Sequence, residues 1–414
     1  MHTPTVTTDS AGLYVHFPYC VSICNYCDFD RQATGFASIP RYVESVVAEI
    51  RLQRQRPIHS IFFGGGTPSL MSDEQVRSIL TAARQQFELL SAAEVTLEAN
   101  PGECTVERLT TFREAGVNRL SIGVQSLDDQ TLEHLSRRHT ADEARAAVSA
   151  ARAAGFYNLS LDFMLGLSGM SVESWLATLD GAIALDPEHL SCYILTVDER
   201  VPMGRDVARG RLLLPSDDEI AEQYLATDKR LGAAGYARYE ISNWSKPGRQ
   251  SRHNLTYWRD EPYLGIGAGA AGWVDGLRTK NTPSPRRYMT SVAAGQVDRV
   301  EEERPDLPTR LGDALALGLR LREGIDLDAL DARLDVDVRA ACGPVLNELL
   351  AAGCLEWHAG RLRIAESSIL VTSELLVRIE GALLDWHERR DAVSVVADTQ
   401  AGAQLADRPV LTGR

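Results

Sequence analysis

Residues 13–30 read LYVHFPYCVSICNYCDFD and set the architecture expected for the first half of the chain. Their first five residues form an apolar run typical of a buried β-strand, and Pro18 ends that run. Cys20, Cys24 and Cys27 follow within eight residues. The sequence therefore predicts a strand that leads directly into a loop rich in metal ligands.

A short apolar strand followed by a helical pattern recurs through residue 234. Strands are predicted at residues 13–17, 58–63, 94–98, 119–123, 158–163 and 189–195. Helices are predicted at residues 41–55, 73–87, 105–115, 141–154, 171–184 and 216–234. Parallel neighbours need such crossovers, so we expect an α/β fold with helices outside a parallel sheet. Spacing does not distinguish an open doubly wound sheet from an incomplete barrel, and both place their chemistry at the C-terminal ends of the strands.

The cysteine loop has the composition of a metal site. Three thiolates on one loop can hold three irons of a cubane [4Fe–4S] cluster and leave the fourth iron open to a small-molecule chelate. A structural zinc site usually takes four ligands in two separated pairs. The other cysteines are scattered, at positions 104, 192, 342 and 354. The spacing favours the cluster over its alternatives, which are a zinc knuckle completed by His16 or three incidental cysteines.

Glycines and polar side chains stand where the other predicted strands end. Residues 64–68 read GGGTP, a turn in which glycine lets the backbone approach a ligand closely, with a plain tight turn as the alternative. The polar residues at or soon after strand ends are Glu98, Asn100, Gln125, Arg137 and Asp162. Each alone is also a common cap or turn former, but their shared edge of the sheet favours one polar pocket. There Arg137 suits a carboxylate, and Gln125 and Asp162 suit the hydroxyls of a sugar.

Aromatic residues surround one histidine further along the chain. Residues 239–244 read YEISNW, residues 253–258 read HNLTYW and residues 263–270 read YLGIGAGA. His253 is placed to ligate a porphyrin iron or to stack beside its plane. The alternative is a structural histidine under an aromatic lid.

Changes in composition and periodicity divide the chain into regions. We expect a core at 11–235, an aromatic and glycine-rich extension of little periodicity at 236–305, a smaller domain at 306–390 and a disordered tail at 391–414. Within the smaller domain the expected elements are a helix at 307–321, an acidic stretch at 326–337, a helix at 345–352 and a hairpin of 354–358 with 361–364. Helices followed by a hairpin predict a winged-helix-like α+β domain.

Composition excludes several classes of protein. The 414 residues carry a net charge of −14, which argues against a protein whose main task is to bind phosphate backbones. Arg361 and Arg363 of the predicted hairpin are the only features that favour a nucleic-acid partner. No run of about 18 apolar residues and no secretory signal is visible, so we expect a cytoplasmic protein that meets membranes only through a partner. The odd count of seven cysteines argues against a disulfide framework.

The CxxxCxxC spacing resembles the signature of the radical S-adenosylmethionine (SAM) superfamily. The resemblance implies that Cys20, Cys24 and Cys27 hold a [4Fe–4S] cluster whose fourth iron is chelated by the amino and carboxylate groups of SAM. Reduction of such a cluster would cleave the S–C5′ bond and release a 5′-deoxyadenosyl radical. Residues 64–68 resemble the glycine motif with which the superfamily binds the amino group of the cofactor.

An ordered series of motifs makes the resemblance more specific. YVHFPYC, FFGGGTPS, EANPG, RLSIGVQS, LDFMLGL, YEISNW, RHNLTYW and YLGIGAGA together resemble the oxygen-independent coproporphyrinogen III oxidase-like group and, within it, the heme chaperone HemW family. This implies a partial (β/α)6 TIM-type radical SAM barrel followed by a small HemN-like C-terminal domain. The true oxidases carry a further cysteine where Phe29 stands here, and a longer N-terminal segment. Residues 166–169 read GLSG in place of the usual GLPG, and Ala271 stands where a histidine commonly follows GAGA, which weakens the case for a second heme-contacting histidine.

The resemblance carries functional positions onto this chain. The residues implied to line the cofactor site are Tyr14, Tyr26, Gly65, Gly66, Thr67, Glu98, Gln125, Arg137, Asp162 and Thr196, and His253 is implied to contact heme. The implied function is a heme chaperone that binds heme, transfers it to heme-accepting apoproteins and receives electrons for its cluster from a donor. It would lack substantial coproporphyrinogen oxidase activity, and no residue is assigned a catalytic role. The alternative is an oxygen-independent coproporphyrinogen III oxidase of porphyrin biosynthesis, an enzyme that would use the same site.

Overall fold

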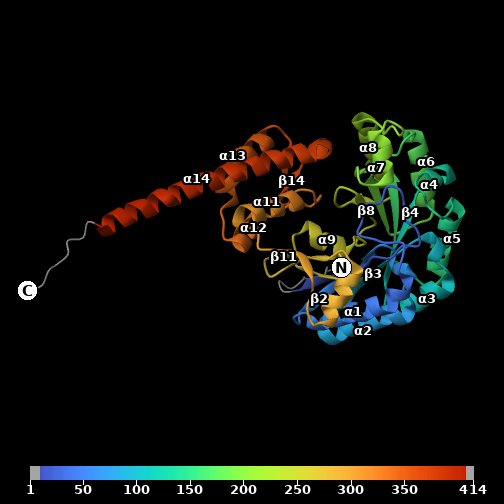
Figure 1. The fold of residues 1–414 in the computed structure, drawn as a ribbon. Coiled ribbons are helices and arrows are strands. Elements are labelled where there is room, and N and C mark those ends of the chain that lie inside the picture. The colour runs from blue at the N-terminus through green and yellow to red at the C-terminus, as the bar shows by residue number, and fades with distance from the viewer. Residues whose placement is uncertain (1–9, 407–414) are drawn as a thin grey trace, which may run out of the picture. The chain divides into compact units, whose positions relative to one another are not determined.

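The structure is a computed structural model that describes the backbone of residues 10–406 and the side chains of residues 10–390. The chain divides into two compact units, the first ending at Arg304 and the second beginning at Pro305 (Figure 1). The division lies one residue before the expected start of the smaller domain at residue 306. No division falls at residue 235, because the expected extension belongs to the first unit.

The six predicted strands of the core are present. They are β1 (Ala11–Phe17), β2 (Pro57–Gly65), β3 (Glu88–Ala99), β4 (Arg119–Gln125), β5 (Leu159–Leu165) and β6 (His189–Ile194). Side chains alternate between the two faces of each strand, so Leu97 on β3 faces away from its neighbour Glu98. Leu97, Ile122 and Leu161 are fully buried on the face that the helices cover, and they form the core between sheet and helices.

The order of these strands decides between the two architectures that spacing left open. β1 to β6 lie side by side in chain order and all neighbours are parallel. A doubly wound sheet reverses its strand order at a switch point, whereas a barrel keeps sequential order. The predicted partial (β/α)6 barrel is therefore confirmed.

The crossover helices follow the prediction as well. They are α1 (Ile39–Leu52), α2 (Asp73–Gln86), α3 (Val106–Ala115), α5 (Ala141–Ala153), α6 (Val172–Ala184) and α8 (Asp217–Ala233). Ser72, Thr140 and Ser216 begin three of them with complete capping boxes, which satisfy amide groups that the first helical turn leaves free. The prediction missed α4 (Asp129–His134) and α7 (Pro202–Ala208), because helices of one or two turns are too short to show apolar periodicity.

Residues 236–305 extend the sheet at both edges. β8 (Asn243–Ser245) and β7 (Ala237–Arg238) follow β6 in antiparallel order. Beyond β1 lie β9 (Tyr263–Ile266), which is parallel to it, and then antiparallel β10 (Ala271–Val274), β11 (Leu277–Asn281) and β12 (Arg299–Glu303). The helices of this region are α9 (Arg252–Trp258) and α10 (Pro285–Ala293). Sequence periodicity missed these strands because none is longer than five residues.

The second unit packs helices against one hairpin. Its elements are α11 (Leu307–Gly318), α12 (Leu327–Leu334), α13 (Val338–Ala351), β13 (Leu355–His358), β14 (Arg361–Ile364) and α14 (Thr372–Ala406). Within residues 10–406 the short 3-10 turns are η1 (Phe36–Ser38), η2 (Pro68–Leu70), η3 (Pro101–Glu103) and η4 (Glu366–Val371). Leu315, Leu346, Leu362 and Ile379 belong to the core of this unit.

The prediction for this unit needs two corrections. The acidic stretch 326–337 contains α12, because Asp326 serves as its N-cap and accepts from the amide of Ala329 at 3.0 Å. Asp337, at the end of the stretch, caps α13 by accepting from the amide of Ala340 at 2.9 Å. The predicted helix 345–352 is the second half of α13, which continues through Pro344.

The structure differs in part from the disordered tail that the sequence predicts at 391–414. α14 continues as a helix to Ala406, through residues 391–406 that the sequence predicts to be disordered. Residues 407–414 lie outside the described part of the chain, as do residues 1–9. Among the described residues, no helix combines the length and the apolarity that crossing a membrane requires.

Candidate functional site

The cysteine loop lies at the C-terminal edge of the sheet, between β1 and α1. Its base is closed by two backbone hydrogen bonds, from Cys20 N to Gln32 O at 3.0 Å and from Gln32 N to Pro18 O at 2.7 Å. Burial raises the pKa of the Cys20 thiol, and the charges of Cys27 and Cys24 raise it further. The three predicted thiols therefore lie near enough to one another to interact, and all three are only partly buried.

The glycine turn after β2 packs against this loop. Gly66 N donates to Phe17 O and Thr67 N donates to Tyr19 O, each at 2.8 Å. A Cβ atom at Gly66 would lie 2.7 Å from Tyr19 O and 3.0 Å from Cys20 Sγ, so no larger residue fits there without moving the loop. Gly65 has φ +112°, a conformation that favours glycine.

A chain of side-chain hydrogen bonds connects two of the cysteines. Thr67 Oγ1 donates to Cys20 Sγ at 3.5 Å, and Asn100 Nδ2 donates to Thr67 Oγ1 at 3.1 Å. Arg137 then donates from Nη2 to Asn100 Oδ1 at 2.7 Å and from Nη1 to Cys24 Sγ at 3.6 Å. We call Thr67, Asn100 and Arg137 the polar arc. Its three residues come from the segments that follow β2, β3 and β4. The sequence predicts such a shared pocket at this edge of the sheet.

Arg137 has a donor left over at this site. Its Nη2 also donates to Gly123 O at 2.7 Å, but its buried Nε has no hydrogen-bond partner. Next to it, burial raises the pKa of Tyr26, and the charge of Arg137 opposes that rise. A guanidinium with a free buried donor beside the Cys24 thiol fits a ligand that presents a carboxylate.

Two carboxyl groups, Glu98 on β3 and Asp162 on β5, lie on the same face of the sheet. Glu98 accepts from Gly65 N at 3.3 Å, and burial together with the charge of Asp162 raises the pKa of Glu98 to about 8. Asp162 accepts from Ser121 at 3.0 Å and from Ser160 at 3.2 Å, and burial raises its pKa against the effect of these hydroxyl groups. Such a pair suits a ligand rich in hydroxyl or ammonium donors, since a donor to either carboxylate offsets its loss of water.

Gln125 and Thr196 lie at the same edge of the sheet. Gln125 adopts φ +65°, which is uncommon outside glycine and asparagine, and its Nε2 lies next to Gly123 beside Arg137. Thr196 is exposed just beyond the end of β6 at Ile194. The structure thus brings the predicted cofactor residues together, with Thr196 at the margin.

His16 does not complete a zinc site in this structure. Its Nδ1 shares a 2.9 Å hydrogen bond with Tyr14 OH, and its Nε2 shares one of 2.8 Å with Asp30 O. Both ring nitrogens are therefore occupied. Among the described residues no three His, Cys, Asp or Glu side chains converge on one metal ion. A cubane cluster does not require such convergence, because each thiolate binds its own iron.

His253 lies apart from the cysteines, near the N-terminal ends of β1 and β2. A Cβ atom at Gly12 would lie 3.0 Å from its ring, and its Nδ1 shares a 2.9 Å hydrogen bond with Ser60 Oγ. Its Nε2 shares a bond of 2.8 Å with Tyr257 OH, and its ring stacks on Phe62 with centroids 5.3 Å apart. Burial lowers the pKa of His253 to about 3. In this conformation the geometry is that of a neutral structural histidine, with no nitrogen free for iron.

Helix α9 closes that end of the barrel. Besides His253, Thr256 of α9 bonds His59 at 2.8 Å and the amide of Arg252 donates to Glu94 at 2.9 Å. Tyr14 stacks on His253 with centroids 6.3 Å apart and stands above it on β1. The aromatic residues of HNLTYW therefore form the floor of the barrel, and the cysteine loop lies at the opposite end.

The YLGIGAGA motif supports the cysteine loop from behind. Gly267 N and Asn281 Nδ2 donate to the buried carboxylate of Glu49, each at 2.8 Å. A Cβ atom at Gly267 would lie 2.6 Å from His16 O, and Lys280 pairs with Asp30 at 3.6 Å. We call Glu49, Gly267, Lys280 and Asn281 the rear support. Ala271, which stands in place of the family's histidine, is exposed at the start of β10.

Sequence reasoning missed several residues that complete the site. Ser121 lies beside Glu98 in the register of β3 and β4, and Ser160 shares a strand face with Asp162. Because side chains on one face recur every second residue, stepping from Glu98 and Asp162 across the predicted sheet would have found both. Nothing local in the sequence marks Glu49, which acts on residues more than 200 positions away.

Two family models match the chain. The Radical SAM superfamily model matches residues 14–182, which hold the cysteine loop, the glycine turn and the polar arc. The HemN C-terminal domain model matches residues 306–371 of the second unit. Fold and site together define a radical SAM protein with a HemN-type C-terminal domain.

Individual relatives narrow the assignment. The heme chaperone HemW of Mycobacterium tuberculosis is 36% identical over 377 residues, which cover 89% of this chain and 95% of the relative. HemW of Bacillus subtilis is 32% identical over 89% of this chain and 99% of the relative. The solved structure of coproporphyrinogen III oxidase HemN from Escherichia coli, a radical SAM enzyme, superposes with a TM-score of 0.77 at 20% identity over 90% of each chain, which shows the shared fold. This chain belongs to the HemW family.

Proposed function

We propose that this protein binds heme and transfers it to heme-accepting apoproteins, and that it carries a [4Fe–4S] cluster and SAM at the C-terminal edge of its barrel. The observation that carries the cofactor part is the polar arc, because it joins Cys20 to Cys24 and leaves a buried arginine donor free. The heme part rests on membership of the HemW family. We further place the protein in the cytoplasm, with an electron donor as a partner, no nucleic acid, and membranes reached only through another protein.

The residues fit the proposed cofactors in kind. Cys20, Cys24 and Cys27 would hold the cluster, and their partial burial limits the access of water. When bound, the pair of cofactors supplies one-electron reductive chemistry. Gly66 leaves space beside Cys20 that a side chain would fill. Arg137 would hold a carboxylate of SAM through its free Nε, and Arg137 keeps its other donors on Asn100 and Gly123.

The inner carboxyl groups have a separate task in this proposal. Glu98 and Asp162 would accept hydrogen bonds from the amino or hydroxyl groups of the cofactor, which offsets the cost of burying them. Gln125 would add a further hydrogen bond from the same side. Tyr14 would support Glu98, since its ring stacks on His253 and the charge of Glu98 acts on its hydroxyl.

We propose that heme contact depends on His253, the histidine of the HNLTYW motif. Its hydrogen bonds determine what direct ligation of the iron would require. Direct ligation would break its hydrogen bonds to Ser60 and Tyr257. Without that rearrangement, His253 acts by holding the floor of the barrel. Substituting His253 by Ala and recording the heme spectrum of folded protein separates these roles, since only ligation makes the iron spectrum depend on it.

The second candidate function is coproporphyrinogen III oxidase, which the shared fold with HemN favours. Phe29 stands at the position where the oxidases carry a further cysteine, and this residue is 62% exposed on the loop. We expect no multiple turnover when reduced, reconstituted protein is incubated anaerobically with SAM and coproporphyrinogen III. Formation of protoporphyrinogen over many turnovers would establish the oxidase instead.

One series of measurements tests the proposed function. Anaerobic reconstitution should yield about four iron and four sulfide per chain. SAM should then change the EPR spectrum of the reduced cluster, and the same protein should bind heme with a defined stoichiometry and pass it to an apoprotein. Zinc in place of iron would refute the cluster, and an EPR spectrum that SAM does not change would refute SAM binding. Absence of heme binding would refute the heme part of the proposal.

A further inference from the structure

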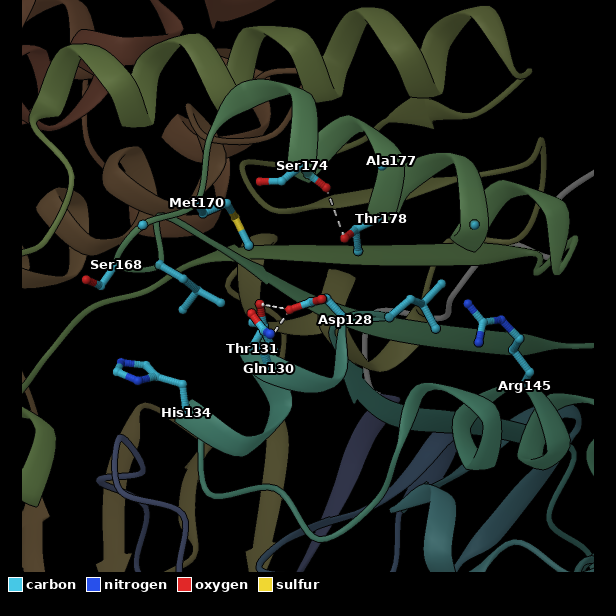
Figure 2. A pocket seen from close by; sticks show the side chains of 14 residues that line it. Asp128, Gln130, Thr131, His134, Arg145, Ser168, Met170, Ser174, Ala177 and Thr178 are labelled. Carbon is cyan, nitrogen blue, oxygen red and sulfur yellow. Dashed lines mark hydrogen bonds between the residues drawn. The ribbon is translucent and has the colours of Figure 1, made fainter.

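Polar side chains gather in two places besides the cysteine loop and the polar arc. One is a cavity of about 530 Å³ between α4, α6 and the loop of residues 166–170, where the bonds are local: Asp128 caps α4 by accepting from the amide and hydroxyl of Thr131 at 2.8 and 2.7 Å (Figure 2). The other is the face of the sheet that carries Asp162, where the bonds pass from one strand to the next. The second set leads to a residue of the proposed cofactor site.

His189 is the central member of this second set. It is the buried first residue of β6, and in the register of β5 and β6 it lies beside Ser160, on the face that carries Asp162. Its Nδ1 shares a 2.7 Å hydrogen bond with Ser160 Oγ, and its Nε2 shares one of 2.9 Å with Tyr239 OH. Both ring nitrogens therefore have fixed partners, one towards the cofactor site and one in the YEISNW motif.

Ser160 decides which nitrogen of His189 carries the proton. A hydroxyl group has a single hydrogen to donate, and that of Ser160 goes to Asp162 Oδ1 at 3.2 Å. Ser160 Oγ therefore accepts from His189 Nδ1–H. A neutral imidazole that is protonated on Nδ1 has a bare Nε2, so Tyr239 OH donates to that nitrogen.

Burial and charge agree with this direction of donors. Burial lowers the pKa of His189 well below its ordinary value, and the charge of Arg119 lowers it further, so the ring is neutral. Burial raises the pKa of Tyr239, whose hydroxyl keeps its proton. Burial also raises the pKa of Asp162, and the neighbouring serine hydroxyls and the charge of Arg119 oppose that rise. A chain of donors that ends on Asp162 favours its ionised form, which accepts hydrogen bonds from a ligand.

The chain of donors begins in two sequence motifs. Asn254 Nδ2 donates to Tyr239 OH at 3.1 Å and to Glu240 Oε1 at 3.3 Å, and Ser242 N donates to Glu240 Oε2 at 2.8 Å. Tyr239 and Glu240 belong to YEISNW, and Asn254 belongs to HNLTYW. Both motifs therefore hold one end of a chain whose other end is Asp162.

We propose that His189 is a positioning residue of the SAM site, which holds Ser160 as a donor to Asp162 and thereby orients that carboxylate towards the hydroxyl groups of the cofactor. Tyr239 fixes the tautomer of His189 from the other side. The inference rests on the proposed function, because it concerns how Asp162 receives the proposed cofactor. It gives the YEISNW motif a task, although none of its residues is among those assigned to the cofactors.

Two substitutions at His189 separate positioning from packing. Asparagine keeps a donor at the place of Nδ1 but leaves a void where the rest of the ring was, whereas leucine fills the space and has no donor. EPR titration of the reduced, reconstituted full chain should give His189→Leu a Kd for SAM about tenfold above that of wild type, and His189→Asn a Kd within about threefold of it. A role in packing alone predicts the opposite order.

Tyr239→Phe tests the other end of the chain, because it removes the hydroxyl and keeps the ring. The Kd for SAM should rise about threefold. The matched control is Tyr236→Phe, which removes from another buried tyrosine a hydroxyl that donates to Pro187 O at 2.7 Å, and which should bind SAM like wild type. Ser160→Ala interrupts the chain, so adding His189→Leu to it should change the Kd by less than about twofold.

Nitrogen-15 NMR of the reconstituted chain with an oxidised cluster and labelled histidine tests the tautomer directly. Of the nine histidines, the one whose ring signals are absent from His189→Asn should be neutral and protonated on Nδ1. A His189 ring that is protonated on Nε2 would overturn the donor chain.

The outcomes separate this inference from the proposed function. Wild type whose reduced cluster gives no EPR response to SAM would refute the cofactor part of the function. Wild type that binds SAM, with His189→Leu unchanged or binding better than His189→Asn, would refute His189 as a positioning residue and leave the function standing. Iron content and circular dichroism verify that each variant is folded.

Discussion

Arg137 shows how much of the candidate site depends on one side chain. It donates to Cys24 Sγ, Asn100 Oδ1 and Gly123 O, and it keeps a buried Nε without a partner. A hydrogen bond between charged groups contributes about 1.5–3 kcal/mol, so a ligand carboxylate at that donor would gain noticeably in affinity. Lysine carries the same charge but lacks the planar fork.

Arg137→Lys should therefore raise the Kd for SAM about tenfold, because the charge remains while the directed donors are lost. EPR titration of the reduced cluster with SAM measures this affinity. Arg138→Lys, which changes the exposed neighbour, serves as the control and should bind like wild type. Equal affinity in the Arg137 variant would remove Arg137 from the cofactor site.

Glu98 gives the cofactor-free protein a pH-dependent stability. Its pKa in the fold is about 8 against an ordinary value of 4.5, so the folded protein holds an extra proton between these values. The contribution of Glu98 to the free energy of unfolding is therefore fully present below pH 4.5 and is lost as the pH rises through 8. Glu98→Gln should remove this decrease, of about 1–3 kcal/mol between pH 5 and pH 8, as measured by urea unfolding. The control is Glu222→Gln at an exposed position, which should keep the pH dependence of wild type. A Glu98→Gln variant that also keeps the pH dependence of wild type would contradict the assignment.

The sequence predicted these residues through motifs, and it missed partners that only pairing of strands reveals. Cys20, Gly66 and Arg137 stand in or near recognisable motifs at strand ends. Ser121 and Ser160 do not, because their role depends on the register between neighbouring strands. For His253, the aromatic neighbours left heme contact and a structural role both open, and the family resemblance implied heme contact. Its two hydrogen bonds are visible only in three dimensions.

At the scale of elements, the glycine turn and the cysteine loop form one structural unit. The turn donates two backbone hydrogen bonds to the loop, and Gly66 faces the Tyr19 carbonyl and the Cys20 sulfur without a side chain between them. The position of Cys20 thus depends on an element that begins about 45 residues later, and on its having no Cβ.

Gly66→Ala should reduce the iron content after reconstitution and destabilise the fold by about 1–3 kcal/mol, because the added methyl group must displace the loop. Iron and sulfide analysis and thermal unfolding provide the measurements. Gly102→Ala is the matched control, since a Cβ there meets nothing within 4 Å. Full cluster content in the Gly66 variant would show that the loop adapts.

Element prediction succeeded where residue patterns are long and failed where they are short. The six core strands and their crossover helices are apolar or amphipathic over enough residues to show periodicity. β7 to β12 have at most five residues each, and they become strands because the core sheet offers edges for pairing. α13 includes Pro344, a residue that usually marks the start or the break of a helix.

At the scale of the whole molecule, charge restricts the choice of partners. The net charge of −14 is distributed over a chain with two compact units, and β12, at one edge of the large sheet, is entirely exposed and carries four charged residues, Arg299, Glu301, Glu302 and Glu303. Charged edge strands resist pairing with other sheets. Neither feature favours a polyanion as a partner.

We therefore expect no binding to duplex DNA or RNA at physiological salt, because phosphate contacts need clustered cations. Fluorescence anisotropy with labelled duplexes, at low and at physiological ionic strength, provides the measurement. The double variant Arg361→Ala with Arg363→Ala should behave like wild type. Salt-dependent binding that this double variant abolishes would revive a nucleic-acid role for the hairpin.

The rear support also sets an order of events during biosynthesis. A chain leaves the ribosome from its N-terminus, so the three cysteines emerge long before Gly267, Lys280 and Asn281, which brace the loop through Glu49, His16 and Asp30. Nascent polypeptide shorter than about 281 residues has the thiols but not their scaffold. If the proposed cluster is bound here, we expect its assembly to follow translation and to require that the thiols stay reduced until then.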